Sequence, residues 1–391
     1  MLTRQLLYLA HAIDHLALLI FATAVTAIAT DFGIGRWEDM MPYATGAFLM
    51  FGVASIPAGQ LGDKWGRRAM MLVFFFGMGA SMLLIAASQS PWQIAGTLAL
   101  MGAFSAIYHP VGIPMLLQHT KTPGATIGIN GLAGNLGIAF AALLTGFLVK
   151  SFGWRVAFVV PGLISLALGV VFWKTVPREL ASPSKKRQSN ARTLDKATAV
   201  KVFSVLMCTT ILGSLVFNFT TNGNGELVRE RVSQVARDPA LLGIALAAIY
   251  AVASLAQVIV GRLIDRYPIR RVFLPIVAMQ ALCFFLAVNA QGTWFFVLAT
   301  AYMVFVFGAI PFTDAIIARF VDDSMRSRVA GLRLGVSFGF SSLAVWMLGP
   351  FVKASGFSTL ILVLACIATL TTVAVCFLPN TEAVELGPNQ R

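Results

Sequence analysis

The chain has 391 residues, of which 58% are hydrophobic and only 12% are charged, against a charged share of about 25% in soluble domains. This composition excludes a soluble protein, because too few polar side chains remain to cover its surface, and a mean hydropathy of +0.81 indicates lipid as the solvent. The formal net charge of +13 would favour nucleic acid in a soluble protein. In a membrane protein, such a positive charge results from basic loops on one side of the membrane, so we expect no nucleic-acid partner.

Crossing a bilayer takes about 20 helical residues, and twelve apolar stretches of this kind follow one another along the chain. We therefore predict an all-α membrane protein in contact with the lipid bilayer. The predicted helices are Leu6–Thr30, Met41–Leu61, Ala69–Ser88, Trp92–Gln118, Gly124–Phe152, Trp154–Trp173, Val200–Thr221, Leu241–Leu263, Val272–Val288, Thr293–Arg319, Ser327–Val352 and Ser358–Leu378.

A polar, basic stretch divides these helices into six and six. We predict an N-terminal bundle at 1–173, a cytoplasmic linker at 174–199, a C-terminal bundle at 200–378 and a cytoplasmic tail at 379–391. Lys and Arg cluster in alternate loops, including the linker, and basic loops stay in the cytoplasm. Both termini are therefore expected on the cytoplasmic side of a bacterial-type inner (plasma) membrane.

The two halves share a repeated segment at a shift of 202 residues. The stretch from Gly59 to Trp65 aligns with the stretch from Gly261 to Tyr267, and each is followed by a pair of arginines, which are Arg68 and its neighbour in the first copy. Two bundles related by such a repeat place a substrate site between them, near the middle of the membrane.

The pattern G-x-L-G-D-x-x-G-R-R, from Gly59 to Arg68, resembles the signature between the second and third helices of the major facilitator superfamily, and Gly261 to Arg266 resembles its shorter echo. The resemblance implies two six-helix bundles related by pseudo-two-fold symmetry, a functional monomer, no enzymatic activity and no cofactor. It assigns a gating role to Gly59, Asp63, Gly66, Arg67, Arg68, Gly261, Asp265 and Arg266.

Two shorter patterns resemble the fosmidomycin-resistance type of drug and proton antiporter. They are His11-x-x-Asp14 in the first predicted helix and Tyr108-His109-Pro110 in the fourth. The Gly-Pro pair that drug antiporters carry in the fifth helix is not clearly present. Apart from this missing pair, the resemblance of the two patterns implies efflux of a small molecule in exchange for protons.

Ionisable side chains inside a membrane cost about 2.5 to 3.5 kcal/mol on insertion scales, so each is a candidate for function. We predict that Asp14 carries the coupling proton and that His11, one turn before it, shares or relays this proton, although a helix-packing role for His11 fits nearly as well. Candidate residues of the substrate cavity are His15, Tyr108, His109, Asn218, Asp314 and Arg333. Arg333 would either neutralise an anionic substrate or pair with Asp314.

Local patterns also predict how the helices bend and pack. Pro110 and Pro114 predict a kink in the fourth helix, and Pro311 predicts one in the tenth. Glycines at a spacing of three, from Gly128 to Gly137, predict a close-packing face on the fifth helix. The run Phe74–Phe76 is expected to face lipid.

The preferred function is a secondary transporter that exchanges protons for a drug-like or anionic amphipathic compound. Uptake of an organic acid or sugar by symport, or carriage of a transition metal, are alternatives. A membrane-embedded metalloenzyme is a further alternative, because His11, Asp14 and His15 formally match the H-x-x-E-H zinc motif with Asp in place of Glu. No third ligand is evident in the sequence, so we predict no metal site.

Overall fold

The computed structural model describes residues 2–118, 120, 123–178, 196–321 and 323–379. Within these ranges the chain is helical, without strands. The helices are α1 (Leu2–Asp31), α2 (Trp37–Met40), the 3-10 turn η1 (Met41–Ala44), α3 (Thr45–Trp65), α4 (Arg67–Ala87), α5 (Pro91–Ser105), the π turn η2 (Tyr108–Gly112), α6 (Ile113–Leu117), α7 (Pro123–Phe152), α8 (Trp154–Thr175), α9 (Lys196–Arg231), α10 (Pro239–Arg266), α11 (Ile269–Ala287), α12 (Gly292–Ala309), α13 (Pro311–Phe320) and α14 (Asp323–Cys376).

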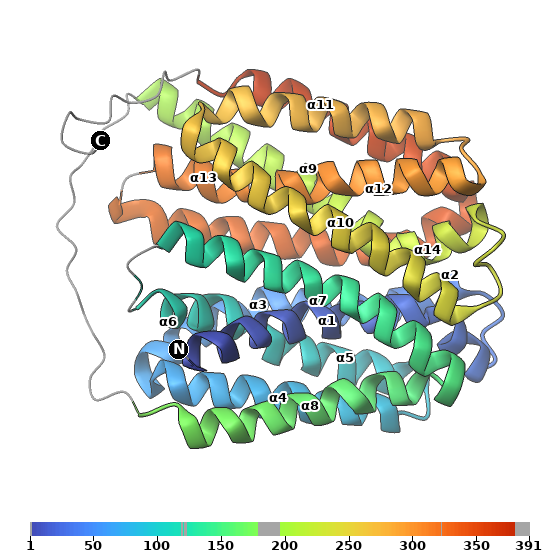
Figure 1. The fold of residues 1–391 in the computed structure, drawn as a ribbon. Coiled ribbons are helices and arrows are strands. Elements are labelled where there is room, and N and C mark those ends of the chain that lie inside the picture. The colour runs from blue at the N-terminus through green and yellow to red at the C-terminus, as the bar shows by residue number, and fades with distance from the viewer. Residues whose placement is uncertain (1, 119, 121–122, 179–195, 322, 380–391) are drawn as a thin grey trace.

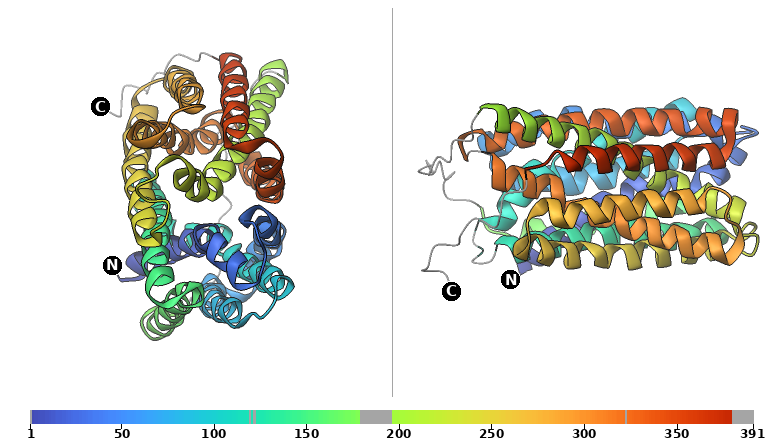
Figure 2. Two further views of the ribbon diagram at one scale, coloured as in Figure 1. Left: turned by 90° about the vertical axis from the view of Figure 1, so that its right-hand side faces the viewer. Right: turned by 90° about the horizontal axis from the view of Figure 1, so that it is seen from above.

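The long helices run side by side and form two groups, α1 to α8 and α9 to α14, which we call the first and second halves (Figure 1). Seen along the helices, the halves are separate groups that meet where α7 packs against α10 and where α3 packs against α14 (Figure 2). We call the end at which α1 begins the terminal end, and the end that holds α2 the far end. The predicted linker, apart from residues 174–178 and 196–199, lies outside the described residues, as does the tail beyond residue 379.

The last helix, α14, is two membrane crossings joined without a loop. Its 54 residues correspond to about 80 Å of helix, more than twice the hydrocarbon thickness of a bilayer. Gly356 interrupts it with φ 77° and ψ 167°, a conformation that side chains beyond glycine rarely adopt. The described residues hold eleven helical segments long and apolar enough to span a membrane, and the turn at Gly356 divides the last of them, which gives twelve crossings, as predicted.

The repeat predicted from the sequence is visible in the backbone and in the contacts. Gly153 joins α7 to α8 with φ 87° and ψ 167°, nearly the conformation of Gly356 at the equivalent turn of the second half. Arg68 Nε donates to Val176 O at 2.6 Å, and Arg270 Nη1 donates to Leu378 O at 3.4 Å. Both members of the second pair are displaced by the same 202 residues as the sequence repeat, so the arginines perform the same task in both halves.

These arginines give a matched pair of stability variants. Arg68 also donates to Trp173 O at 2.6 Å, so it satisfies two carbonyls at the end of α8, whereas Arg270 makes one longer bond. Hydrogen bonds to charged groups contribute about 1.5 to 3 kcal/mol each when protected. Because Arg68 is half-buried, we expect Arg68→Ala to destabilise the protein by about 1 to 2 kcal/mol and Arg270→Ala by less. Thermal unfolding in detergent, followed by tryptophan fluorescence, measures the difference, and an equal loss in both variants would contradict it.

The fourth and tenth crossings are broken at their prolines, as predicted. The fourth consists of α5, the π turn at Tyr108–Gly112 and α6, because Pro110 and Pro114 cannot donate to the preceding turn. The tenth consists of α12 and α13, separated at Pro311. The seventh crossing begins at Lys196, four residues before the predicted start at Val200, because a polar first turn carries no hydrophobic signal.

Two packing predictions have different outcomes. An added Cβ at Gly137 would collide with the backbone of Ala12, so the predicted glycine face does press α7 onto α1, although Gly128 has no neighbour within 4 Å. The prediction that Phe74–Phe76 faces lipid is wrong for two of the three residues. Phe74 and Phe75 are fully buried, and only Phe76 is exposed, because α4 packs against both α8 and the fourth crossing.

Candidate functional site

The candidate site is built around Asp14, in the middle third of α1. Its side chain is fully buried. Ser105 Oγ, at the end of α5, donates a hydrogen bond to Asp14 Oδ1. The other oxygen, Oδ2, has no hydrogen-bond partner and lies 3.7 Å from His109 Nε2. A buried carboxylate with one unsatisfied oxygen requires a positive partner, a proton or a compensating cation.

Three histidines gather beside this carboxylate. The rings of His11 and His15 have centroids 4.7 Å apart, and those of His11 and His109 are 5.2 Å apart. One ligating atom from each of the three lies within 4.8 Å of the others. The structure thus brings His15, a candidate cavity residue, into the same cluster as His11 and His109.

His11 is also held by the fifth crossing. Its Nδ1 lies 2.7 Å from the backbone oxygen of Asn130, and its ring stacks on Tyr108 with centroids 4.7 Å apart. Because a carbonyl oxygen only accepts, Nδ1 carries the proton. His11 Nε2 is buried and has no hydrogen-bond partner. The helix-packing interpretation of His11 is thus confirmed for one ring nitrogen, and the other is left without a hydrogen-bond partner.

Tyr108, predicted to line the cavity, lies behind the cluster. It is fully buried, and its hydroxyl lies 2.6 Å from Asn130 Oδ1 and 2.9 Å from Leu7 O, so its single proton is shared between two acceptors. Sequence analysis missed Asn130, which holds both His11 and Tyr108. The available signal was its position: a shift of 203 residues aligns this polar residue with Arg333 in the second half.

The π turn places His109 at this point of the fourth crossing. Pro110 removes a backbone donor, and the wider turn from Tyr108 to Gly112 accommodates the loss. His109 is consequently half-buried and turned toward Asp14 and toward the second half. Broken helices of this kind are where transporters form binding sites.

Aromatic rings join the halves next to His109. Phe51 of α3 and Phe338 of α14 have ring centroids 4.1 Å apart, and Phe51 lies edge-on to His109 at 5.8 Å. A Cβ added to Gly52 would lie 2.7 Å from Phe338 Cβ. Sequence analysis missed this contact, because phenylalanines in apolar helices give no sign of which ones face the other half.

The second half contributes an ion pair, as predicted. Arg333 Nη2 lies 2.9 Å from Asp314 Oδ1, and Arg333 Nη1 donates to Thr313 Oγ1 at 2.7 Å. The Arg333 side chain is 16% exposed and that of Asp314 66%, so the pair reaches from the protein interior to an open surface. The pairing of Arg333 with Asp314 is confirmed, and a role in binding an anionic substrate stays a prediction.

Asn218, a candidate residue of the substrate cavity, lies away from the histidine cluster. It is buried between α9 and α14, where its Nδ2 donates to Ser214 O at 3.0 Å and to Ser341 Oγ at 2.7 Å. This arrangement makes Asn218 part of the packing within the second half, and it contributes no contact to the histidine cluster.

Ionic and polar contacts join the two halves at the far end. Lys150 Nζ lies 2.5 Å from Asp238 Oδ2, and Lys353 Nζ lies 2.6 and 2.8 Å from the two carboxylate oxygens of Asp39. Thr26 Oγ1 donates to Glu226 Oε1 at 2.6 Å. Among pairs in which the structure describes both members, these are the hydrogen bonds and ion pairs that link the halves. The far end is therefore closed.

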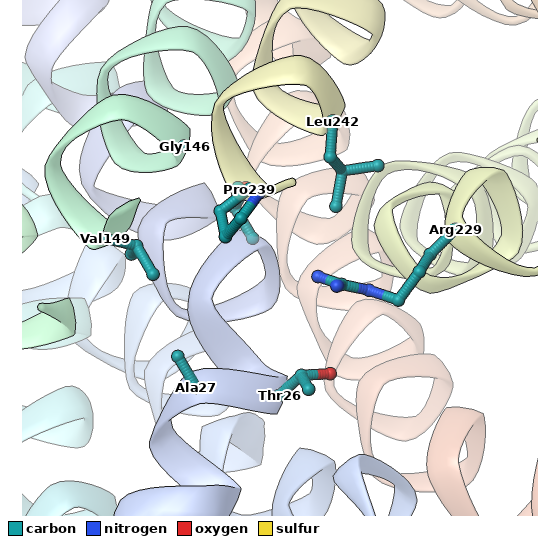
Figure 3. A pocket seen from close by; sticks show the side chains of 8 residues that line it. Thr26, Ala27, Gly146, Val149, Arg229, Pro239 and Leu242 are labelled. Carbon is teal, nitrogen blue, oxygen red and sulfur yellow. The ribbon is translucent and has the colours of Figure 1, made fainter. Parts of the chain in front are cut away.

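A small cavity of about 110 Å³ remains within this closed end. Figure 3 shows Thr26 and Arg229 pointing toward it from α1 and α9, between Gly146 of α7 and Pro239 of α10. Arg229 Nε also lies 3.1 Å from Glu226 Oε2. Residues of both halves line the cavity, and its volume is small, so it marks the joint between the halves.

The ion pair of Lys150 with Asp238 gives a test of far-end closure by pH. The Lys150 ammonium, which donates to the carboxylate, holds the pKa of Asp238 below its usual value of 3.8. Because the pKa is lowered, the ion pair stabilises the closed far end at pH values above the usual pKa. This stabilisation is lost as the pH falls through the lowered pKa. We expect Asp238→Asn to loosen the far end at neutral pH, as acid does in the wild type. Asn still caps the helix, so the variant removes only the ion pair. Spin-label distances across the far end measure this, and a variant as closed as the wild type at neutral pH would contradict it.

The glycines of the predicted gating motif lie at the terminal end. An added Cβ would lie 2.8 Å from a side-chain carbon of the fourth crossing at Gly62, and 3.4 Å from Pro110 at Gly59, so α3 packs closely on the π turn. Gly66 turns the chain between α3 and α4 with φ 91°. Gly261, the equivalent of Gly59, has no neighbour within 4 Å of an added Cβ.

The charged residues of the motif have separate surroundings. Arg67 Nη1 donates to Pro114 O at 3.3 Å, which ties α4 to the end of the fourth crossing. The side chains of Asp63, Asp265 and Arg266 are exposed. Their gating role stays a prediction.

Comparisons with known proteins bear on the whole chain. The family model described as Major Facilitator Superfamily matches residues 7–228 and 230–391. A solved D-xylose-proton symporter has a TM-score of 0.78 at 15% identity, over 96% of this chain and 97% of that one. A bacterial homologue of the lysosomal transporter Spinster, solved in an inward-facing conformation, has a TM-score of 0.70 at 15% identity, over 96% of this chain and 94% of that one. These likenesses show the fold.

Curated relatives match over shorter segments. Multidrug resistance protein MdtG of Yersinia enterocolitica is 24% identical over 64% of this chain and 60% of its own length. The gallate transporter of Pseudomonas putida is 21% identical over 66% of this chain and 64% of its own length. The matched segments thus cover less than two thirds of either relative.

Proposed function

Since the chain belongs to the Major Facilitator Superfamily and is a multi-pass membrane transporter, we propose that it exports a small amphipathic or anionic molecule in exchange for protons. The superfamily is not enzymatic, so the metalloenzyme alternative is set aside. The chain acts as a monomer in a bacterial-type inner membrane, with both termini in the cytoplasm and no cofactor.

One observation carries the proposal: a buried, half-satisfied carboxylate lies inside the first half behind His109, and the two halves are joined at one end. The ion pairs at the far end hold that end shut, while added Cβ atoms at Gly128 and Gly331, near the terminal end, meet nothing within 4 Å. With the termini in the cytoplasm, this is an inward-facing state. Rocking of the halves about Asp14 then exposes it to either side in turn.

Asp14 binds the coupling proton in this proposal. Its Oδ1 is fixed by Ser105 and its Oδ2 is free, so one oxygen orients the group while the other takes up and releases the proton. His109, 3.7 Å from Oδ2 and half-buried, lies between Asp14 and the interface of the halves, where it relays the proton. His11 positions His109 and His15 through its ring contacts.

The proposed substrate class rests on the residues between the two halves and on the names of the relatives. Phe338 is half-buried against the buried Phe51, and Arg333 lies five residues earlier on the same helix. An aromatic ring and a cation on one helix suit an amphipathic molecule with a negative group. Relatives are named as a multidrug resistance protein and as a gallate transporter. Gallate is an aromatic acid, so the second name also fits the alternative, in which the same site would carry an aromatic acid inward by symport.

A direct experiment separates these directions. The purified protein is reconstituted in proteoliposomes with an imposed pH gradient, and a panel of drug-like amphiphiles, aromatic acids and sugars is followed in both orientations of the gradient. We expect accumulation of an amphipathic or anionic compound against the direction of proton flow. Accumulation with the proton flow would establish symport, and the absence of gradient-driven transport for every compound would contradict proton coupling.

A further inference from the structure

The histidine cluster has an arrangement that proton transfer alone does not require. Three of the four histidines of the chain, from two helices that are far apart in sequence, bring one ligating atom each to within 4.8 Å of the others. Imidazole nitrogens are the ligands that zinc, copper, nickel and cobalt prefer, and three of them form a common divalent-metal site.

Two orphaned acceptors point to a cation in this cluster. His11 donates its Nδ1 proton to Asn130 O, so its Nε2 presents a lone pair, and that nitrogen is buried without a hydrogen-bond partner. Asp14 Oδ2 is a second buried acceptor without a partner. Unsatisfied buried acceptors are costly, and neighbouring neutral histidines can supply at most one N–H each. A metal ion bound by His11 Nε2 would satisfy the first acceptor directly and place a positive charge beside the second.

The surroundings of His11 match those of known metal ligands. A ligating histidine almost always donates its second ring nitrogen to a carbonyl or carboxylate, which fixes the tautomer and the ring orientation. His11 has such a carbonyl in Asn130, and His109 Nε2 lies 3.7 Å from the Asp14 carboxylate, close enough for charge attraction but beyond hydrogen-bond distance. Ser105 orients the carboxylate in turn. The cluster therefore has ligands and the partners that hold ligands in place.

We propose that His11, His15 and His109 form a binding site for one divalent transition-metal ion of the zinc class. Zn–N bonds of about 2.0 to 2.1 Å place tetrahedral ligand atoms about 3.4 Å apart. His15 and His109 are only half-buried, so small side-chain rotations bring their nitrogens to this spacing. Asp14 provides the negative charge beside the ion, and the ion and the coupling proton exclude each other. The inference rests on the proposed function only in placing the cluster on the transport path.

The test uses Co²⁺ and Zn²⁺ with the full-length protein in detergent, purified through an affinity tag without histidine. We expect one Co²⁺ per chain, with the intense visible absorption of a tetrahedral site, and its displacement by Zn²⁺ but not by Mg²⁺. His15→Ala removes a ligand that makes no hydrogen bond in the described structure, so folding should survive. Loss of a direct ligand should weaken binding beyond the about 10-fold to 100-fold seen for outer-shell partners.

Two further variants keep the result interpretable. His119→Ala removes the remaining histidine of the chain, which lies outside the described residues, and binding should be unchanged. His15→Cys replaces one ligand with another, so binding should return with a thiolate-to-cobalt absorption band that the wild type lacks. A wild type without a tetrahedral Co²⁺ spectrum, or equal binding in His15→Ala, would overturn the metal site.

The outcome is separable from that of the proposed function. Protein that transports in response to a pH gradient but binds no Co²⁺ overturns the metal site and leaves proton-coupled transport standing. Protein that binds Co²⁺ with the expected spectrum but shows no gradient-driven transport supports the metal site and contradicts the proposed function. Transport assays therefore include a chelator throughout.

Discussion

Asp14→Asn reduces proton-driven accumulation of the substrate to the level of protein-free liposomes, while the protein stays folded in the membrane. Asn has the same shape as Asp and keeps an oxygen for the hydrogen bond from Ser105, but its amide does not exchange a proton. Removing a buried charge that lacks a full set of partners relieves a cost rather than adding one. We therefore expect the thermal midpoint of unfolding to stay unchanged or rise, which separates loss of coupling from loss of fold.

Ser105→Ala is the graded control for this prediction. It leaves the carboxylate in place but removes the donor to Oδ1, so coupling should persist with an altered pH dependence. The measurement is substrate accumulation in proteoliposomes across a series of imposed pH gradients. Undiminished uphill transport by Asp14→Asn would remove Asp14 from the coupling mechanism, whatever the behaviour of Ser105→Ala.

The sequence was sufficient for the architecture because the membrane constrains it strongly. Backbone groups in lipid must be satisfied within helices, so apolar stretches of sufficient length become crossings, and the prolines at Pro110 and Pro311 become breaks. The sequence repeat predicted that the two halves have the same fold, and the equivalent contacts of Arg68 and Arg270 confirm this. The two crossings of α14 are also explained in this way, because the single residue Gly356 turns the chain between them in place of a loop.

The candidate site was predictable in its members and only partly in its contacts. A charged or ionisable residue in an apolar helix is conspicuous, so Asp14, His11 and His109 were found by their type alone. Which side of a helix faces a neighbour is not conspicuous when the helix is apolar all round. Asn130 and the buried Phe74 were therefore missed or misplaced, because their roles depend on how α7 and α4 pack against other crossings.

The relation between the halves was the least predictable feature, because it depends on small residues whose neighbours are distant in sequence. Gly349 of α14 lies against the backbone of Glu38 in α2, and Gly146 of α7 lies against Gly243 of α10. A glycine in a helix costs about 1 kcal/mol relative to alanine. Glycines at such contacts let the backbones of the two halves approach, and the approach closes the far end.

Gly349→Ala should hold the far end open and abolish net transport. An added Cβ at this position would collide with the carbonyl of Glu38 at a distance that real Cβ atoms do not show. The colliding atoms are backbone, so no side-chain rotation relieves the overlap and α14 must move away from α2. The ion pair of Lys353 with Asp39, 2.6 Å long and formed one turn further along α14, should be lost with the same movement.

Spin-label distances provide the measurement. Labels on cysteines introduced at Gly35 and Arg237, both exposed at the far end, in a chain whose native cysteines are replaced, report the separation of the halves. We expect an increase of several ångströms in Gly349→Ala and proteoliposome transport at background. Gly339→Ala is the matched control, because it lies on the same helix with no neighbour within 4 Å of an added Cβ, so its distances and transport should equal those of the parent. If Gly349→Ala keeps the parent's distance and transport, closure at α2 is not part of the transport cycle, and the hinge between the halves must lie at the contact of Gly146 with Gly243.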